Sequence, residues 1–289
     1  TLSISGSSGT ITSGAPLTLK RRPAPALWIG AGVVAAALAG IAIVWWALPR
    51  GHQPSQSFQN MRINALTSRG DVSDCTLSPD GRYLAYIAGR AGRKTLRVRQ
   101  IATGSDVEIL PAGDVLIQNP SFSPDGNYLF YTAVRREKRN YRALLQVASL
   151  GGTPRERAFD VDSKVSFSPD GKQLVFWRRV PDTAESLLVA VDLATWKERV
   201  VATATAAEPF LGAPAWSPDG KRIAGALLRP APNLESTIVL FDPSTGRRED
   251  LAKLPRTIVS SLAWLRDGTG ILSSGLDLKT ALTNQVRLH

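Results

Sequence analysis

The tetrapeptide Ser-Pro-Asp-Gly occurs at residues 78–81, 123–126, 168–171 and 217–220, and a degenerate copy, Leu-Arg-Asp-Gly, occupies residues 265–268. The copies follow one another at steps of 45, 45, 49 and 48 residues. Such a near-constant period is typical of a repeat architecture, in which each repeat is one supersecondary unit. The pattern covers most of a chain of 289 residues.

Each copy of the motif predicts a tight turn. Proline at the second position presets φ, aspartate tolerates the next position, and glycine supplies a positive φ. The serine hydroxyl can accept a hydrogen bond from a turn amide. We therefore assign turn chemistry, rather than a binding role, to the motif residues Ser78, Pro79, Asp80, Gly81, Ser123, Pro124, Asp125, Gly126, Ser168, Pro169, Asp170, Gly171, Ser217, Pro218, Asp219 and Gly220.

Strand-like segments surround every turn. The segments after the turns are 83–87, 128–131, 173–177 and 222–226, and third strands are expected at 96–101, 144–148, 187–192 and 237–242. Four antiparallel strands in a repeat of about 47 residues are typical of a β-propeller blade. The sequence predicts an all-β propeller over 58–289, with about five blades near 68–112, 113–160, 161–206, 207–254 and 255–289.

Two apolar columns precede the motif. The residue just before it is Leu77, Phe122, Phe167, Trp216 or Trp264, and two residues further back stand Cys75, Pro120, Val165, Pro214 and Leu262. Large side chains in these columns are expected to pack between blades. Cys75 shares an apolar column, so it is predicted to be buried and unreactive.

A stretch of 22 uncharged residues, Leu27 to Leu48, predicts one transmembrane helix. Trp28 lies at one end of it and Trp45 at the other, where indole rings favour the membrane interface. Lys20, Arg21 and Arg22 precede the stretch, which favours a cytoplasmic N-terminus. Residues 1–26 are expected to be a disordered cytoplasmic linker, 49–57 a second linker, and the propeller an extracytoplasmic domain at the inner membrane of a bacterium. Gly32, Ala36 and Gly40 lie on one helix face, where small residues let two spans pair into a homodimer.

The sequence argues against several kinds of catalytic and metal chemistry. The chain has one cysteine and two histidines, His52 and His289, so an internal disulfide, a Ser-His-Asp triad or a histidine-rich metal site is not expected. It has no Gly-x-Ser-x-Gly elbow, Walker A loop or calcium loop. We expect no enzyme activity, no cofactor, no metal and no nucleic-acid contact from this chain.

Residues 58–289 resemble the PD40 (WD40-like) repeats of TolB-type propellers. The segments 66–87, 99–110, 122–132 and 151–171, together with a basic tether and one span, resemble the extracytoplasmic part of membrane-anchored bacterial serine/threonine kinases. That resemblance implies a cytoplasmic kinase domain before Thr1, although this chain contains no kinase motif. The predicted function is a sensor or interaction module. The alternatives are the propeller of a membrane-bound winged-helix regulator, an envelope binding or trafficking module, or a hydrolase cap.

The propeller is expected to be incomplete as given. Its fifth repeat matches a third strand at 284–289 without a fourth, and 58–67 is expected to be an isolated outer strand at the edge of an open arc. Loops between second and third strands should share one face, which collects ten basic residues against four acids and predicts an anionic envelope ligand or a protein partner. The basic residues are Arg90, Arg93, Lys94, Arg135, Arg136, Lys138, Arg139, Arg178, Arg179 and Arg229.

Overall fold

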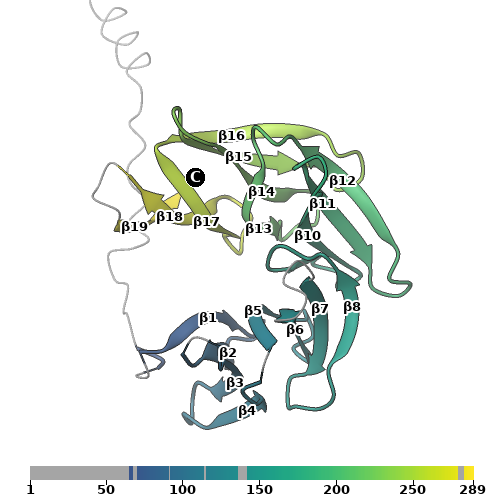
Figure 1. Cartoon of the computed structure of the whole chain (residues 1–289), viewed down its shortest axis with the longest axis vertical. Coiled ribbons are helices and arrows are strands. Elements are labelled where there is room, and N and C mark those ends of the chain that lie inside the picture. Colours follow the sequence, from purple (N-terminus) through teal and green to yellow (C-terminus); the bar gives the residue numbers. More distant parts are fainter. Residues whose placement is uncertain (1–64, 68–69, 91, 114, 136–141, 279–282) are drawn as a thin grey trace, which may run out of the picture. The chain divides into compact units, whose positions relative to one another are not determined.

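Five antiparallel sheets follow one another along the chain (Figure 1). The computed structural model describes residues 65–67, 70–90, 92–113, 115–135, 142–278 and 283–289. The first four sheets have four strands each and the fifth has three. The all-β propeller with four-stranded blades, predicted from the repeat, is therefore confirmed for the described residues.

The strands alternate with turns in simple meanders. We number the blades 1 to 5 in chain order. The strands are β1 (Val72–Leu77), β2 (Tyr83–Ala88), β3 (Thr95–Gln100) and β4 (Asp106–Leu110) in blade 1; β5 (Val115–Phe122), β6 (Tyr128–Arg135), β7 (Arg142–Ala148) and β8 (Arg155–Phe159) in blade 2; β9 (Ser166–Phe167), β10 (Gln173–Arg179), β11 (Ser186–Asp192) and β12 (Glu198–Ala204) in blade 3; β13 (Phe210–Trp216), β14 (Ile223–Arg229), β15 (Glu235–Phe241) and β16 (Arg248–Pro255) in blade 4; and β17 (Thr257–Trp264), β18 (Ile271–Asp277) and β19 (Thr283–Leu288) in blade 5.

All five blades use the same register at the first turn. The residue before the motif pairs with the first core residue after it, as in Phe122 with Leu129 and Trp216 with Ile223. The degenerate copy repeats this pairing between Trp264 and Ile271. Because a slip of one residue would exchange the two faces of a strand, this constant register gives every blade the same two packing faces.

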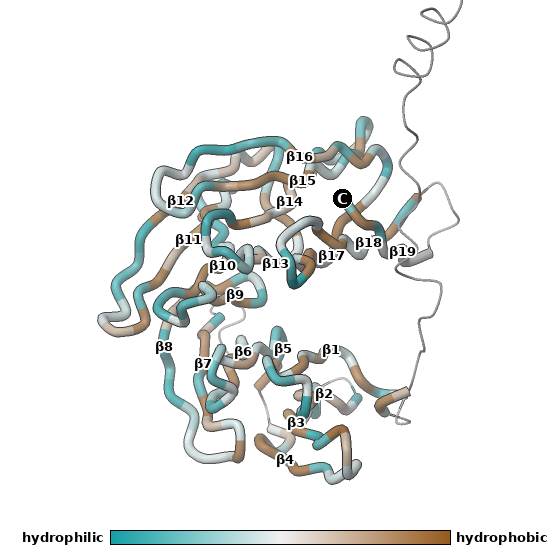
Figure 2. The backbone as a smooth tube through the Cα atoms, turned by 180° about the vertical axis from the view of Figure 1, so that it is seen from behind, coloured by the Kyte–Doolittle hydropathy of each residue, from teal (hydrophilic) through white to brown (hydrophobic). Residues whose placement is uncertain are grey.

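The hydrophobic cores lie between successive blades. Each of four clusters combines residues from one blade with residues from the next. Between blades 3 and 4, the rings of Trp177 and Phe210 stack with their centroids 3.9 Å apart. Figure 2 shows apolar residues along β14 and β15 and mostly polar residues along the outer strand β8. The fold is therefore held together by apolar contacts between sheets.

The start of blade 1 corrects one prediction. Cys75 is exposed, and Leu77 keeps 54% of its surface exposed, whereas Phe122 and Trp216 in the same column as Leu77 are buried. This column packs against the preceding blade, as Phe122 does against blade 1. No blade precedes blade 1 among the described residues, so the apolar character of this column does not lead to burial there.

The described arc is not closed by pairing. No strand of blade 1 pairs with a strand of blade 5 within the described ranges. Residues 58–64 of the predicted outer strand lie outside the described residues, and 65–67 do not form a strand. The predicted linkers, the span at 27–48 and the pairing residues Gly32, Ala36 and Gly40 also lie outside them. Within the described ranges, no helix is long and apolar enough to span a membrane.

Candidate functional site

The motif residues form one hydrogen-bonded turn in each of the first four blades. In blade 1 the Ser78 hydroxyl donates to Asp80 Oδ1 at 2.6 Å and accepts from the Tyr83 amide at 2.9 Å. The Arg82 amide donates to the same carboxylate at 3.0 Å. Gly81 has φ 71°, the left-handed value for which glycine is suited. The polar side chains of the motif therefore form their hydrogen bonds within the turn itself.

These contacts also set the acidity of the motif aspartates. The hydrogen bond from the serine hydroxyl is the largest cause that lowers the pKa of Asp80, Asp125, Asp170 and Asp219. Each carboxylate lies in a separate blade. Among the described residues, no group of three or more His, Cys, Asp or Glu side chains could hold a metal ion. The repeated aspartates therefore stabilise turns and do not converge on one site.

The predicted basic face is less basic than the sequence count suggests. Arg178 donates to both carboxylate oxygens of Glu198, at 2.6 and 2.8 Å, and to the Phe159 carbonyl at 2.7 Å. The hydrogen bond to Glu198 raises the pKa of Arg178. Arg229 forms an ion pair with Glu208 and a longer one with Glu235, at 3.6 Å. These two arginines are neutralised by neighbouring carboxylates.

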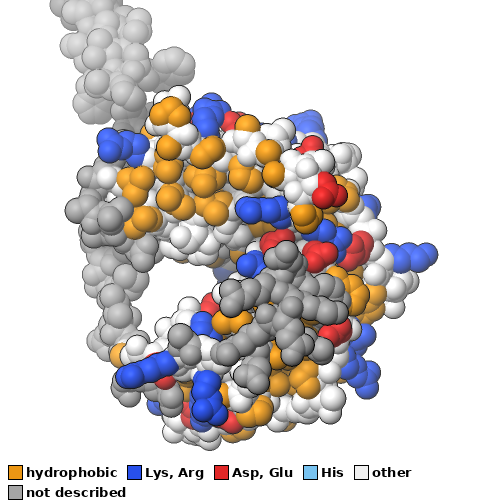
Figure 3. All heavy atoms as spheres, viewed as in Figure 1, with side chains coloured by type: hydrophobic (Ala, Val, Ile, Leu, Met, Phe, Trp, Pro, Cys, Tyr) orange, Lys and Arg blue, Asp and Glu red, His pale blue; other side chains and the backbone are white. Residues whose placement is uncertain are grey.

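The sequence count missed the acids in the linkers between blades. A linker that leaves an outer strand emerges on the same face as the loop between second and third strands. Asp162, in the linker before β9, accepts from the Arg179 amide at 2.8 Å, and Glu208, in the linker before β13, binds Arg229. Acidic and basic side chains are accordingly interspersed on the surface in Figure 3. This face carries a weaker positive field than the loops alone predict.

Of the eight remaining members of the basic set, five lie in the part of the chain that the structure describes and three do not. Arg90, Arg93 and Arg179 are exposed, and Lys94 donates to the Ser73 hydroxyl at 3.1 Å. Arg135 ends β6. The others, Arg136, Lys138 and Arg139, lie outside the described residues.

A groove between blades 2 and 3 lies on the opposite face, beside the motif turns. It has a volume of about 520 Å³. Its walls combine aromatic rings with a few polar groups, a composition common in ligand sites. The residues that give it this character are Tyr128, Phe167, Trp196, Arg157, Gln146 and Asp170.

Trp196 gives this groove its most unusual feature. It has φ 58°, in the left-handed region, at the turn between β11 and β12. Gly104 and Gly246, with φ 70° and 72°, end the corresponding turns of blades 1 and 4. A non-glycine residue there costs about 1–2 kcal/mol. The sequence carries a signal for this residue that the motif period alone does not reveal, because Asp-Leu-Ala-Thr-Trp at 192–196 matches Asp-Pro-Ser-Thr-Gly at 242–246 with tryptophan in place of glycine.

Two contacts across the blade junction position the Trp196 ring. The Arg157 guanidinium lies over it, 4.9 Å from the centroid, and Phe130 stacks at 6.4 Å. Arg157 also donates to Gln146 Oε1 at 2.7 Å, which fixes the guanidinium. The indole is partly exposed. The junction therefore presents a fixed aromatic and cationic surface beside two acidic turns.

Comparison with known proteins agrees with this architecture. No protein-family model matches the chain. The chain is 26% identical over 123 residues to a protein TolB homolog of Chlorobium chlorochromatii (strain CaD3), a match that covers 42% of this chain and 27% of that protein. TolB from Acinetobacter baumannii superposes with a TM-score of 0.61 at 19% identity, covering 77% of this chain and 57% of that one. A structure assigned to TolB from Agrobacterium tumefaciens gives 0.63 at 18% identity, covering 78% and 80%. The chain thus matches only part of the length of the first two relatives.

Proposed function

Because the described residues fold as a TolB-like β-propeller, we propose that this chain carries the non-catalytic, extracytoplasmic binding module of a single-pass membrane protein. Its partner is a protein or an anionic envelope glycan. In the form favoured by the sequence, the module is the C-terminal sensor part of a receptor-like serine/threonine kinase. A winged-helix regulator or an envelope trafficking protein would use the same module with another effector or with none.

The observation that carries the binding role is the strained tryptophan in the groove between blades 2 and 3. Strained backbone conformations persist where surrounding structure supports them, and they cluster at functional sites. Here the turn tolerates glycine in two other blades, so nothing in the turn itself requires Trp196. An aromatic ring held by Arg157 beside hydrogen-bonding groups is suited to stack on a sugar ring or a planar peptide group.

The first test concerns the groove. Trp196→Gly restores the residue that blades 1 and 4 use, so the turn should be retained. We expect it to weaken binding to isolated cell-wall glycan strands about tenfold or more, as truncation of an aromatic anchor does. The matched control is Leu251→Ser, which replaces an apolar side chain that is 42% exposed on β16. Equal binding by both variants and the parent chain would contradict a role for the groove.

The second test concerns the basic loop face. Replacing the exposed Arg90, Arg93 and Arg179 with Gln should weaken binding to anionic glycans and reduce its salt dependence, because fewer charges attract the polymer. The control replaces three exposed bases on the turn face, Lys172, Lys221 and Arg247. Loss of binding in both triple variants alike would point to net charge instead of this face.

The membrane anchor rests on the uncharged stretch Leu27–Leu48. A phosphatase reporter that folds only outside the cytoplasm, fused after His289, should be active, and deletion of residues 27–48 should release the chain from membranes. Substituting Leu for Gly32, Ala36 and Gly40 should lower pairing of the spans in a dimerisation assay. An inactive reporter would place the propeller on the cytoplasmic side.

The kinase assignment rests on the resemblance of the propeller segments and tether to that family. The residues encoded before Thr1 test it directly. We expect a glycine-rich loop followed by His-Arg-Asp and Asp-Phe-Gly motifs. A winged-helix domain in that place would favour the regulator alternative.

A further inference from the structure

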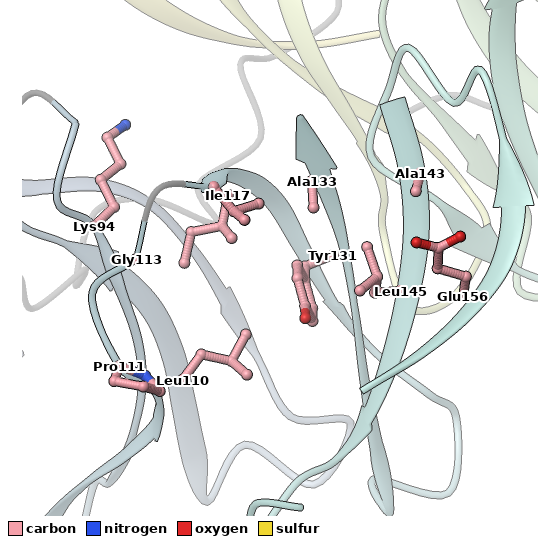
Figure 4. A pocket seen from close by; sticks show the side chains of 11 residues that line it. Lys94, Leu110, Pro111, Gly113, Ile117, Tyr131, Ala133, Ala143, Leu145 and Glu156 are labelled. Atoms are coloured by element: carbon pink, nitrogen blue, oxygen red, sulfur yellow. The ribbon is translucent and has the colours of Figure 1, made fainter. Parts of the chain in front are cut away.

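A cavity separate from the groove lies between blades 1 and 2. Its volume is about 210 Å³, and most of its lining is apolar. Figure 4 shows Tyr131 in the middle of it, between Ile117 and Leu110 on one side and Leu145 on the other. The exposed linker residues Pro111 and Gly113 also line it, so the cavity reaches the surface there.

The hydroxyl of Tyr131 lacks a hydrogen-bond partner among the described residues. The side chain is 3% exposed, and its hydroxyl points into the cavity (Figure 4). Burial raises the pKa of this phenol, so it is a neutral hydrogen-bond donor at physiological pH. Because the cavity reaches the surface, this hydroxyl is available to a molecule that enters the cavity. Among the described residues, Trp177 Nε1 is a fully buried side-chain polar atom without a hydrogen-bond partner, and the Tyr131 hydroxyl differs from it because it faces an open cavity.

The repeat supplies an internal comparison. Tyr86 holds the same position in blade 1, and its hydroxyl donates to Asp106, which also accepts from Arg97 Nε at 2.8 Å. Tyr86 pairs across the sheet with Arg97, whereas Tyr131 pairs with Leu145. Blade 2 therefore keeps the buried tyrosine but replaces the adjacent polar side chain with an apolar one.

We propose that this cavity binds a small, uncharged, ring-sized molecule, or one such group of a larger molecule, whose single polar atom accepts a hydrogen bond from Tyr131. Leu110, Ile117 and Leu145 form an aliphatic wall around Tyr131, where a charged group would be poorly solvated. The two charged side chains that line the cavity, Lys94 and Glu156, lie on opposite sides of this aliphatic part (Figure 4). An apolar cavity of about 150 Å³ accommodates benzene, so this one accommodates a substituted six-membered ring. In the aliphatic part around Tyr131, a water molecule would have fewer than the two to four polar partners that a buried water normally needs.

Two probes of nearly equal size separate the hydrogen bond from the apolar contact. These are 4-methylphenol and toluene, titrated into the purified chain and followed by calorimetry. We expect both to bind and 4-methylphenol to bind about tenfold more tightly, the usual effect of one hydrogen bond. Tyr131→Phe should remove this preference and leave toluene binding within about twofold.

Two further variants control for shape and position. Ala133→Leu fills the cavity from β6 and should abolish binding of both probes. Tyr86→Phe removes the equivalent hydroxyl of blade 1 and should leave the preference for 4-methylphenol unchanged. Binding of neither probe to the parent chain, or a preference that survives in Tyr131→Phe, would overturn the proposal. Because neither probe is an envelope glycan, this outcome is independent of the groove tests above.

Discussion

At the residue scale, two glycines in equivalent turns meet different surroundings. Gly104 and Gly246 both have positive φ, but a Cβ on Gly246 would lie 2.2 Å from the Val201 carbonyl oxygen, whereas on Gly104 it would lie 3.3 Å from the mobile end of Arg99. We predict that Gly104→Ala costs about 1–2 kcal/mol of unfolding free energy, from backbone strain alone. Gly246→Ala should cost about 3–5 kcal/mol, because the β12 backbone must also move. Urea denaturation measures both, and equal costs would contradict the clash with β12.

The serine of the motif supports a second residue-scale prediction, which concerns pH. Ser217, 3% exposed, donates to Asp219 Oδ1 at 2.6 Å and accepts from the Arg222 amide at 2.9 Å. Ser217→Ala should cost about 1–3 kcal/mol at neutral pH, because it leaves that amide without its partner. The hydrogen bond lowers the pKa of Asp219 below 3.8, so its contribution is present above 3.8 and lost as pH falls through the lower folded-state value.

The measurement follows from that sign. Urea midpoints for the parent chain should fall steeply as the pH drops below about 4. The difference between the parent and Ser217→Ala should shrink over the same range, since the protonated Asp219 no longer gains from the serine. A difference that grows toward low pH would contradict the assignment.

At the element scale, β14 packs closely against the preceding blade because Gly225 has no side chain. Gly225 lies mid-strand, where alanine is ordinarily better by about 0.5–1 kcal/mol. A Cβ there would lie 2.9 Å from the ring of Trp177 on β10. The Trp177 ring is also stacked on Phe210, so it cannot easily yield. The close contact between these two blades depends on glycine opposite tryptophan.

The corresponding prediction is a thermodynamic coupling between the two positions. Gly225→Ala should destabilise the parent by about 1–3 kcal/mol through overpacking. In a Trp177→Leu background the same change should be neutral or stabilising, because the ring is gone. A double-mutant cycle read by urea denaturation measures the coupling. Independent effects at the two positions would mean that β14 can shift away from β10.

At the scale of the whole molecule, the open end of the arc decides the reactivity of the single cysteine. Cys75 is exposed because no described blade packs on its side of β1. We predict that a thiol reagent labels the native chain at a rate within about tenfold of the urea-unfolded chain, since accessibility controls the reaction. The unfolded chain is the control for complete labelling. Protection of a hundredfold or more would mean that another part of the molecule covers this face.

The sequence by itself determined the blade and its repetition. The Ser-Pro-Asp-Gly period, the positive-φ glycines and the apolar columns are local features, so they predicted the turns, the strand order and the all-β fold. The degenerate fifth copy keeps the same register: its column residue, Trp264, pairs with Ile271.

Only the tertiary structure decided what each column faces. Cys75 and Val165 share a pattern, yet Val165 packs against blade 2, whereas Cys75 is exposed and no blade precedes it among the described residues. The tertiary structure also placed linker acids beside Arg178 and Arg229, and left Tyr131 without the partner that Tyr86 has. Burial, charge pairing and cavities arise from contacts between blades that are distant in sequence. A one-dimensional pattern specifies which side chains can pack, but the neighbouring blade determines whether they do.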